Sequence, residues 1–357
     1  MSKQKKQNFK MDRTQKCCKF SKSSANTKEE EVILQVYDKK KEEFQFPVLS
    51  NVNDLNQLVR DGFVKDVVNI FEVLQERRIS GIAWKIAHQE GVRIVMVAGP
   101  SASGKTTFSK RLSLYLLAHK LKPISLSLDD YFVDRDLTPR DDKGDYDFES
   151  LYALDLRLFH QHMTQLLSGE EVELPKYNFV EGKSCMSGRK LRLQPDMILI
   201  LEGIHGLNPE LTRDLPAESI YRIFASALSD VMIGDGTILA KRDNRLLRRM
   251  VRDARYRGAD ASNTLGRWQS VINGEEKWIF PCQQYADAQF NSSMMYEVAV
   301  LKEQAMGLLA EVKAEDEGYG KAQQLLEILG KYESIDEKYL PPTSLLREFL
   351  GGSNFHY

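Results

Sequence analysis

The chain has 357 residues, of which 42% are hydrophobic and 28% are charged, a composition typical of soluble globular proteins with one large domain or two ordinary ones. With 50 Lys and Arg against 51 Asp and Glu, the formal net charge of −1 argues against a surface adapted as a whole to nucleic acid or to an anionic membrane. The longest apolar runs are only strand-sized, so no transmembrane helix is predicted. Four cysteines without a paired pattern indicate a reducing compartment, and we expect a cytoplasmic protein.

The first part of the chain, residues 1–52, is predicted to be a basic tail followed by a short strand-like segment. Residues 1–28 contain nine Lys or Arg and one acid, with few apolar side chains, a pattern typical of disorder. A mitochondrial presequence is the alternative, which we disfavour because the tail is Lys-rich and has no amphipathic stripe. Residues 31–49 indicate two short strands about a charged turn, and the apolar spacing in residues 53–91 predicts a helical preface.

The next part, residues 92–300, is predicted to be an α/β domain with a parallel sheet flanked by helices. Short β-branched apolar runs alternate there with helical segments, which is typical of a sheet covered on both faces. The predicted strands are Val92–Ala98, Pro123–Leu128, Met197–Leu201 and Ile220–Ala225. Leucines at helical spacing in residues 301–357 predict a helical C-terminal extension.

The strongest motif follows the first of these strands: Gly99-Pro-Ser-Ala-Ser-Gly-Lys-Thr matches G-x-x-x-x-G-K-[ST] and precedes a predicted helix from Thr107 to His119. In such a P-loop, backbone N–H groups and a helix N-terminus face phosphate oxygens, Lys105 neutralises the β and γ phosphates, and Thr106 can bind Mg²⁺. The alternative is an ordinary glycine-rich turn. From the motif and its place between a strand and a helix, we predict ATP and Mg²⁺ as cofactors. The predicted phosphate site is formed by Gly99, Ser101, Ala102, Ser103, Gly104, Lys105, Thr106 and Thr107.

Acidic residues end two other predicted strands. Asp129 and Asp130 follow the strand Pro123–Leu128, at the carboxyl edge where open α/β sheets bind ligands. We predict that Asp129 positions an attacking hydroxyl, takes its proton and reaches Mg²⁺, the alternative being a simple turn cap. Glu202 ends the strand Met197–Leu201, and its place downstream of a P-loop predicts a carboxylate that serves the metal.

The segment Lys241–Arg257 has eight basic and two acidic residues, and its apolar side chains form one helical stripe. The arginines predicted along the other side are Arg245, Arg248, Arg249, Arg252 and Arg255. Such a helix could bind nucleic acid phosphates, close over nucleotide phosphates as a lid, or be a solvated face. The P-loop favours the lid, because phosphoryl transfer needs cations on the developing charge and exclusion of water.

Aromatic and acidic side chains also occur in two segments predicted to be loops, Tyr146–Glu149 and Leu174–Phe179. They suggest an acceptor pocket that stacks a ring and binds sugar hydroxyls. The alternative is that these aromatic residues belong to the hydrophobic core.

Taken in order and spacing, six segments resemble the uridine kinase and phosphoribulokinase family. They are Gly99–Thr107, Leu126–Phe132, Tyr146–Glu149, Leu174–Phe179, Ile198–Gly203 and Arg245–Gly258. Stretches such as SLDDYFVDRDLTPRD and ELPKYNF are most similar to a bacterial-type subgroup of uridine kinase-like proteins with a threonyl-tRNA synthetase-like N-terminal region. The resemblance begins near Asn53, so we expect that N-terminal region to be absent or degenerate here.

This resemblance implies a P-loop NTPase fold of the nucleoside kinase type with an arginine-rich lid. It also implies transfer of the ATP γ-phosphate to the 5′-hydroxyl of uridine or cytidine, a step of pyrimidine salvage. The residues it carries over are Asp129, Lys105 and Arg252 for catalysis, Arg257 for the ATP phosphates, Thr106, Glu202 and Asp129 for Mg²⁺, and Glu149, Tyr177, Phe179 and Arg249 for the acceptor.

The chain departs from the family pattern at two positions: Gly182 stands where uridine kinases place a base-contacting His, and Ala259 stands where they place an Arg. A kinase of the same fold with another small alcohol as acceptor therefore remains an alternative, as does a non-catalytic nucleotide-binding regulatory or RNA-associated protein. The expected partners are ATP and a nucleoside, with no membrane and no nucleic acid. Formation of a homo-oligomer is left open.

Overall fold

A computed structural model describes residues 32–38, 43–45, 47–140 and 144–356 of the protein. The predicted basic tail and the charged turn at residues 39–42 lie outside the described residues. Among the described helices, none combines the length and the apolar character needed to cross a membrane.

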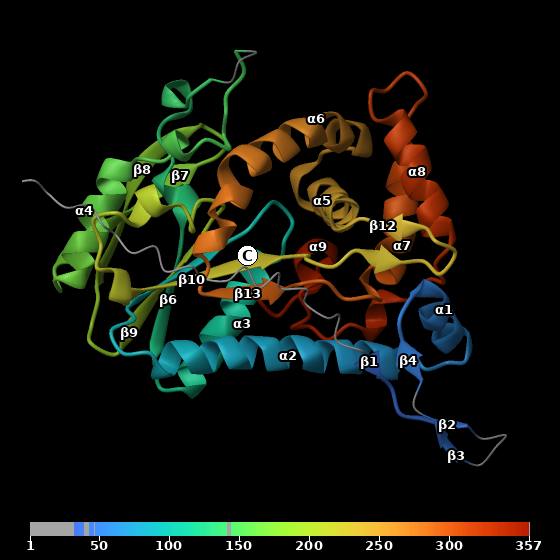
Figure 1. Cartoon of the computed structure of the whole chain (residues 1–357). Coiled ribbons are helices and arrows are strands. Elements are labelled where there is room, and N and C mark those ends of the chain that lie inside the picture. Colours follow the sequence, from blue (N-terminus) through green and yellow to red (C-terminus); the bar gives the residue numbers. More distant parts are fainter. Residues whose placement is uncertain (1–31, 39–42, 46, 141–143, 357) are drawn as a thin grey trace, which may run out of the picture. The chain divides into compact units, whose positions relative to one another are not determined.

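A sheet of five parallel strands forms the centre of the fold, in the order β13-β10-β5-β9-β6 (Figure 1). Its strands are β5 (Ile94–Ala98), β6 (Lys122–Ser127), β9 (Met197–Glu202), β10 (Ile220–Ser226) and β13 (Ala288–Asn291). The four predicted strands are confirmed. Strand β13 was not predicted, because its sequence AQFN has only one large apolar side chain and lies at an edge of the sheet.

Side chains of the central strand β5 alternate between two hydrophobic cores. Val95 and Val97 face the core formed with α2, α3, α5 and α7, whereas Ile94 and Met96 face the core formed with α4. Because successive side chains of a strand point to opposite faces, an uninterrupted apolar run places the strand between two layers. All five residues of β5 are buried, which confirms a sheet covered on both faces.

Helices precede, separate and follow the strands of the sheet. They are α1 (Val52–Arg60), α2 (Val64–His88), α3 (Lys105–Ala118), α4 (Leu156–Leu167), α5 (Lys241–Arg257), α6 (Ala261–Gly274), α7 (Glu297–Ala310), α8 (Tyr319–Gly330) and α9 (Arg347–Leu350). Helix α2 packs on α3, and α5 packs on both α7 and α9 (Figure 1). Helix α1 begins at a capping box in which Asn51 and Asp54 satisfy each other's backbone N–H groups.

The remaining strands form short antiparallel pairs. They are β1 (Val32–Ile33) with β4 (Val48–Leu49), β2 (Val36–Asp38) with β3 (Glu43–Gln45), β7 (Glu171–Asn178) with β8 (Lys183–Arg192), and β11 (Val231–Met232) with β12 (Ile238–Leu239). The loop predicted over Leu174–Phe179 is therefore wrong, because most of it is strand β7. Pro175 obscured that strand, and it lies at the register shift in the β7–β8 ladder, where a missing N–H is tolerated.

Candidate active site

The P-loop connects β5 to α3 and is shaped by close backbone approaches. A Cβ at Gly99 would lie 1.9 Å from the Ala225 carbonyl oxygen on the neighbouring strand β10, so only glycine fits there. Ala102 and Gly104 adopt left-handed backbone conformations, with φ of 55° and 84°. Such a backbone turns successive N–H groups toward one concavity, which together with the α3 N-terminus forms an anion site.

Three P-loop and strand residues form the centre of the site. The Lys105 Nζ lies 3.8 Å from Glu202 Oε1 and donates to the Pro100 carbonyl at 3.2 Å. The Thr106 hydroxyl donates to Glu202 Oε2 at 3.4 Å. Burial raises the pKa of Glu202 from 4.5 to about 7, even though Lys105 acts against this shift. Lys105, Thr106 and Glu202 therefore bring a cation, a hydroxyl and a carboxylate together.

Asp129 adds a second carboxylate to this centre. It lies in a short 3₁₀ turn, Leu128–Tyr131, directly after β6, and its backbone N–H donates to the Ser127 hydroxyl at 3.2 Å. Burial raises the pKa of Asp129, while the charges of Lys105 and Arg257 lower it. Asp129 thus lies within electrostatic reach of both the P-loop and the arginine helix α5.

The donor set fits Mg²⁺ that is shared with a nucleotide. Within the described ranges, no group of three or more His, Cys, Asp or Glu side chains could hold a metal ion by itself. Mg²⁺ at phosphate-transfer sites characteristically uses one or two carboxylates, a hydroxyl and phosphate oxygens. Thr106, Glu202 and Asp129 have the hydroxyl and carboxylate oxygens that could hold Mg²⁺ together with phosphate oxygens.

The predicted arginine stripe on α5 is only partly correct, because Arg245 and Arg248 are buried. Arg245 is 2% exposed and forms a bidentate ion pair with Glu275, with N–O distances of 2.6 and 2.7 Å. The same guanidinium donates to the Ser101 carbonyl at 3.0 Å, and the Ser101 N–H donates to Glu275 at 3.2 Å. This pair therefore fixes one peptide of the P-loop from inside the protein.

Arg248 repeats this arrangement one turn further along α5. It is fully buried, pairs with the Glu297 carboxylate and donates to the Ala102 carbonyl at 3.5 Å. The helical periodicity of α5 could not predict that these arginines are buried, because their glutamate partners come later in the chain.

Three further arginines of α5 gather around Asp253, a buried residue that the sequence analysis did not single out. Its carboxylate oxygens lie 3.3 Å from Arg249 Nε, 2.7 Å from Arg252 Nη2 and 3.5 Å from Arg257 Nη1. Arg249 also donates to the Ser101 hydroxyl at 2.8 Å. The spacing of Asp253 four residues from both Arg249 and Arg257 was the signal that could have identified it.

The predicted acceptor residues fall into two groups. Burial raises the pKa of Glu149 to about 7, with the charges of Arg249 and Lys105 acting against the shift, so Glu149 lies within electrostatic reach of both. Tyr177 and Phe179 instead pack on each other and on Phe132, with ring centroids 5.0–6.4 Å apart. The backbone N–H of Tyr177 donates to the carboxylate of Asp130, beside Asp129, at 3.4 Å.

The two positions that depart from the family pattern have different surroundings. Gly182 has φ +68°, and a Cβ there would lie 2.7 Å from the guanidinium of Arg135, which donates to the Phe179 carbonyl at 2.6 Å. Arg135 therefore occupies the space beside the aromatic pair. The Ala259 backbone N–H donates to the Asp253 carbonyl at 3.2 Å, so Ala259 takes part in ending α5.

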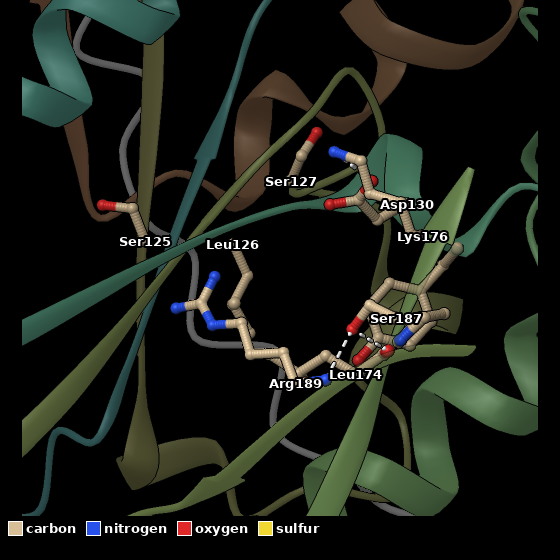
Figure 2. A pocket seen from close by; sticks show the side chains of 10 residues that line it. Ser125, Leu126, Ser127, Asp130, Leu174, Lys176, Ser187 and Arg189 are labelled. Atoms are coloured by element: carbon tan, nitrogen blue, oxygen red, sulfur yellow. Dashed lines mark hydrogen bonds and ion pairs between the residues drawn. The ribbon is translucent and has the colours of Figure 1, made fainter. Parts of the chain in front are cut away.

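A separate hollow of about 120 Å³ lies between β6 and the β7–β8 hairpin (Figure 2). Its polar wall includes Lys176, whose Nζ lies 3.4 Å from Asp130 Oδ1, and Ser187, which donates to the Leu174 carbonyl at 2.6 Å. Arg189 also lines it. None of its lining residues belongs to the P-loop.

The last element near the site, α9, was not connected with it by the sequence analysis. The Glu348 carboxylate of α9 accepts hydrogen bonds from the Thr107 backbone N–H at 2.9 Å and from the Thr107 hydroxyl at 2.8 Å. The two residues are 241 positions apart, so no local pattern could have indicated this contact.

The chain is similar to known proteins over the region that contains the P-loop. Residues 94–299 match the family model described as phosphoribulokinase / uridine kinase family, which covers more than half of the chain. A uridine kinase of Staphylococcus aureus (strain JH9) is 27% identical over 195 residues, which are 54% of this chain and 84% of that relative.

Two solved structures are also similar. One, from Bacillus stearothermophilus and described as a "possible uridine kinase", has a TM-score of 0.41 and 19% identity, covering 60% of this chain and 97% of that one. The other, a D-glycerate 3-kinase from Cryptococcus neoformans, has a TM-score of 0.37 and 15% identity, covering 56% and 85%. On the strength of the family match, the chain belongs to the phosphoribulokinase / uridine kinase family.

Proposed function

We propose that this family member is an ATP-dependent nucleoside kinase that transfers the γ-phosphate of ATP to the 5′-hydroxyl of uridine or cytidine. The observation that carries the proposal is the convergence of Lys105, Glu202 and Asp129 at the end of a P-loop. Phosphoryl transfer needs little covalent chemistry from the protein and depends on positioning and on electrostatic stabilisation. The 92–300 region is the proposed kinase domain.

The nucleotide would bind along the P-loop and the first turn of α3. Lys105 would neutralise the β and γ phosphates, and the backbone N–H groups from Gly99 to Thr107 would face their oxygens. Thr106, Glu202 and Asp129 would hold Mg²⁺, which neutralises phosphate charge when bound. Arg252 and Arg257, held together by Asp253, would bring positive charge to the phosphates as the transfer proceeds.

Asp129 would position the acceptor hydroxyl and take its proton. Because burial raises its pKa, this carboxylate is a better proton acceptor than an exposed aspartate would be. Glu149, with Arg249 beside it, would accept hydrogen bonds from sugar hydroxyls. Tyr177 and Phe179 would contact the base from the other side.

The name uridine kinase of the S. aureus relative supports a pyrimidine nucleoside as acceptor. A second candidate is another small alcohol, and the observation that favours it is the replacement of a base-contacting His by Gly182, with Arg135 in the adjacent space. A guanidinium beside the aromatic pair favours an acceptor with a carbonyl or anionic group at that end.

The test is ADP release by the purified chain with Mg²⁺ and ATP, against a panel of nucleosides and small sugar alcohols, with the product identified by mass. Lys105→Ala should abolish turnover, and Asp129→Asn should lower kcat by about 10²–10⁴-fold while ATP binding is retained. Asp66→Asn, an exposed residue of α2, is the control and should leave kcat unchanged. Full kcat in Asp129→Asn would remove the proposed base, and ATP binding without any phosphorylated acceptor would favour the regulatory alternative.

A further inference from the structure

The C-terminal segment, residues 344–352, lies against the P-loop and the arginine helix at once. Leu345 packs on Gly104, so closely that a Cβ there would lie 2.7 Å from a Leu345 methyl carbon. At the other end, a Cβ at Gly351 would lie 2.7 Å from the Arg255 guanidinium. Phe349 and Leu350 of α9 are buried in the hydrophobic core. Helix α9 packs on α5 (Figure 1), which anchors the segment in this position.

This anchored segment directs one carboxylate at the P-loop helix. Glu348 accepts from both the backbone N–H and the hydroxyl of Thr107, at 2.9 and 2.8 Å. Thr107 is in the first turn of α3, where backbone N–H groups have no partner within the helix. Those donors are the ones that a P-loop offers to phosphate oxygens. A carboxylate oxygen and a phosphate oxygen therefore compete for the same pair of hydrogen bonds.

The charges around Glu348 make this competition stronger. The negative charge of Glu348 raises the pKa of the buried Glu202, as the charge of Asp129 does, whereas the charge of Lys105 lowers it. A nucleotide brings several more negative charges to this cluster. Since like charges at short range in a partly buried site repel strongly, phosphate and the Glu348 carboxylate disfavour each other even where their hydrogen bonds differ.

We infer that Glu348 is an intramolecular competitor of the nucleotide, bound at Thr107 in the nucleotide-free protein and displaced when ATP binds. The inference rests on the proposed function, because it concerns the same P-loop. For displacement, the Glu348 side chain must leave Thr107. Its departure breaks the two hydrogen bonds that join α9 to α3. The C-terminal segment thereby lowers the affinity of the site for phosphate and couples nucleotide binding to the state of α9.

The test compares ATP affinity in the full chain and in Glu348→Gln, which keeps the shape of the side chain but removes its charge. We expect Mg²⁺·ATP to bind about tenfold more tightly to the variant, because a hydrogen bond to a charged group is lost from the nucleotide-free state only. Adenosine, which has no phosphate, should bind both proteins equally. Glu327→Gln, an exposed glutamate on α8, is the matched control and should leave both affinities unchanged.

Equal or weaker ATP binding by Glu348→Gln would overturn the inference and leave the kinase proposal intact. Failure of the wild-type chain and the variant alike to bind ATP would instead refute the proposed function, and the inference with it. A second measurement needs no variant: hydrogen exchange of the backbone amides in residues 347–351 of the wild-type chain should become faster with Mg²⁺·ATP but not with adenosine. Unchanged or slower exchange with Mg²⁺·ATP would also overturn the inference.

Discussion

The buried pair of Arg245 and Glu275 allows a quantitative test of how α5 supports the P-loop. The side chains are 2% and 0% exposed and share two hydrogen bonds of 2.6 and 2.7 Å. Glu275→Gln keeps the shape of the side chain but leaves the Arg245 guanidinium buried without a countercharge. Removing one partner of a buried ion pair costs about 3–5 kcal/mol, so we expect the free energy of unfolding to fall by that amount.

A neighbouring ion pair between the same two parts of the chain provides the control. Arg242 Nη2 lies 2.9 Å from Glu276 Oε1, but these side chains are 40% and 57% exposed. Exposed pairs contribute about 0–1 kcal/mol, because water screens the charges and both side chains lose conformational freedom. Glu276→Gln should therefore change the free energy of unfolding by less than about 1 kcal/mol.

The assay is urea unfolding at constant pH, followed by two optical probes. The double variant Arg245→Met with Glu275→Leu removes both charges together. Its loss in the free energy of unfolding should be much smaller than the summed losses of Arg245→Met and Glu275→Leu made singly. Since Arg245 also donates to the Ser101 carbonyl, Glu275→Gln should raise the KM for ATP. If Glu275→Gln and Glu276→Gln lowered the free energy of unfolding equally within error, the assigned burial of the pair would be refuted. A loss in the double variant equal to the sum of its two single losses would also refute it.

Three further predictions concern the site itself. Gly99→Ala should destabilise the protein by several kcal/mol, because its Cβ would lie 1.9 Å from a carbonyl oxygen, whereas Gly307→Ala, with no atom within 4 Å, should be neutral or stabilising in thermal melting. Asp253→Asn should raise the KM for ATP about 10–100-fold in ADP-release kinetics, because three arginines lose their common partner; an unchanged KM would exclude them from the phosphate site. Because the pKa of Glu149 is raised to about 7, the carboxylate is largely protonated at pH 6 and ionised at pH 8. The KM for the acceptor should therefore rise as the pH falls through 7. Glu149→Gln should have a high acceptor KM that does not depend on pH in this range.

The features that were predictable from the sequence are those fixed by short segments. Strands β5 and β9 appear as continuous apolar runs, because a strand between two layers buries both of its faces. The P-loop is equally local, since Gly99 and Lys105 belong to one turn between a strand and a helix. Asp129 and Glu202 follow from the rule that parallel strands present their carboxyl ends at one edge of the sheet, and the charge of Lys105 acts on both carboxylates.

The features that were not predictable depend on partners far away in the chain. Glu275 and Glu297 decide which arginines of α5 are buried, but the helical period only shows where apolar side chains lie. Strand β8 is almost fully exposed and has no alternating pattern, so only its pairing with β7 defines it. Glu348 reaches Thr107 because the C-terminal helices fold back onto α5, a consequence of tertiary packing alone.

Helix α5 shows that the number of charged residues in a segment can misrepresent how much unpaired charge the folded protein presents there. Eight basic and two acidic residues give Lys241–Arg257 the composition of a nucleic acid-binding helix. In the described part of the chain, however, Arg245 and Arg248 are neutralised by buried glutamates, and Asp253 is shared by Arg249, Arg252 and Arg257. Arg249 donates to the Ser101 hydroxyl, so a phosphate that binds at this arginine approaches from the P-loop side. That direction suits a nucleotide held by the P-loop better than a polyanion lying along the outside of the helix.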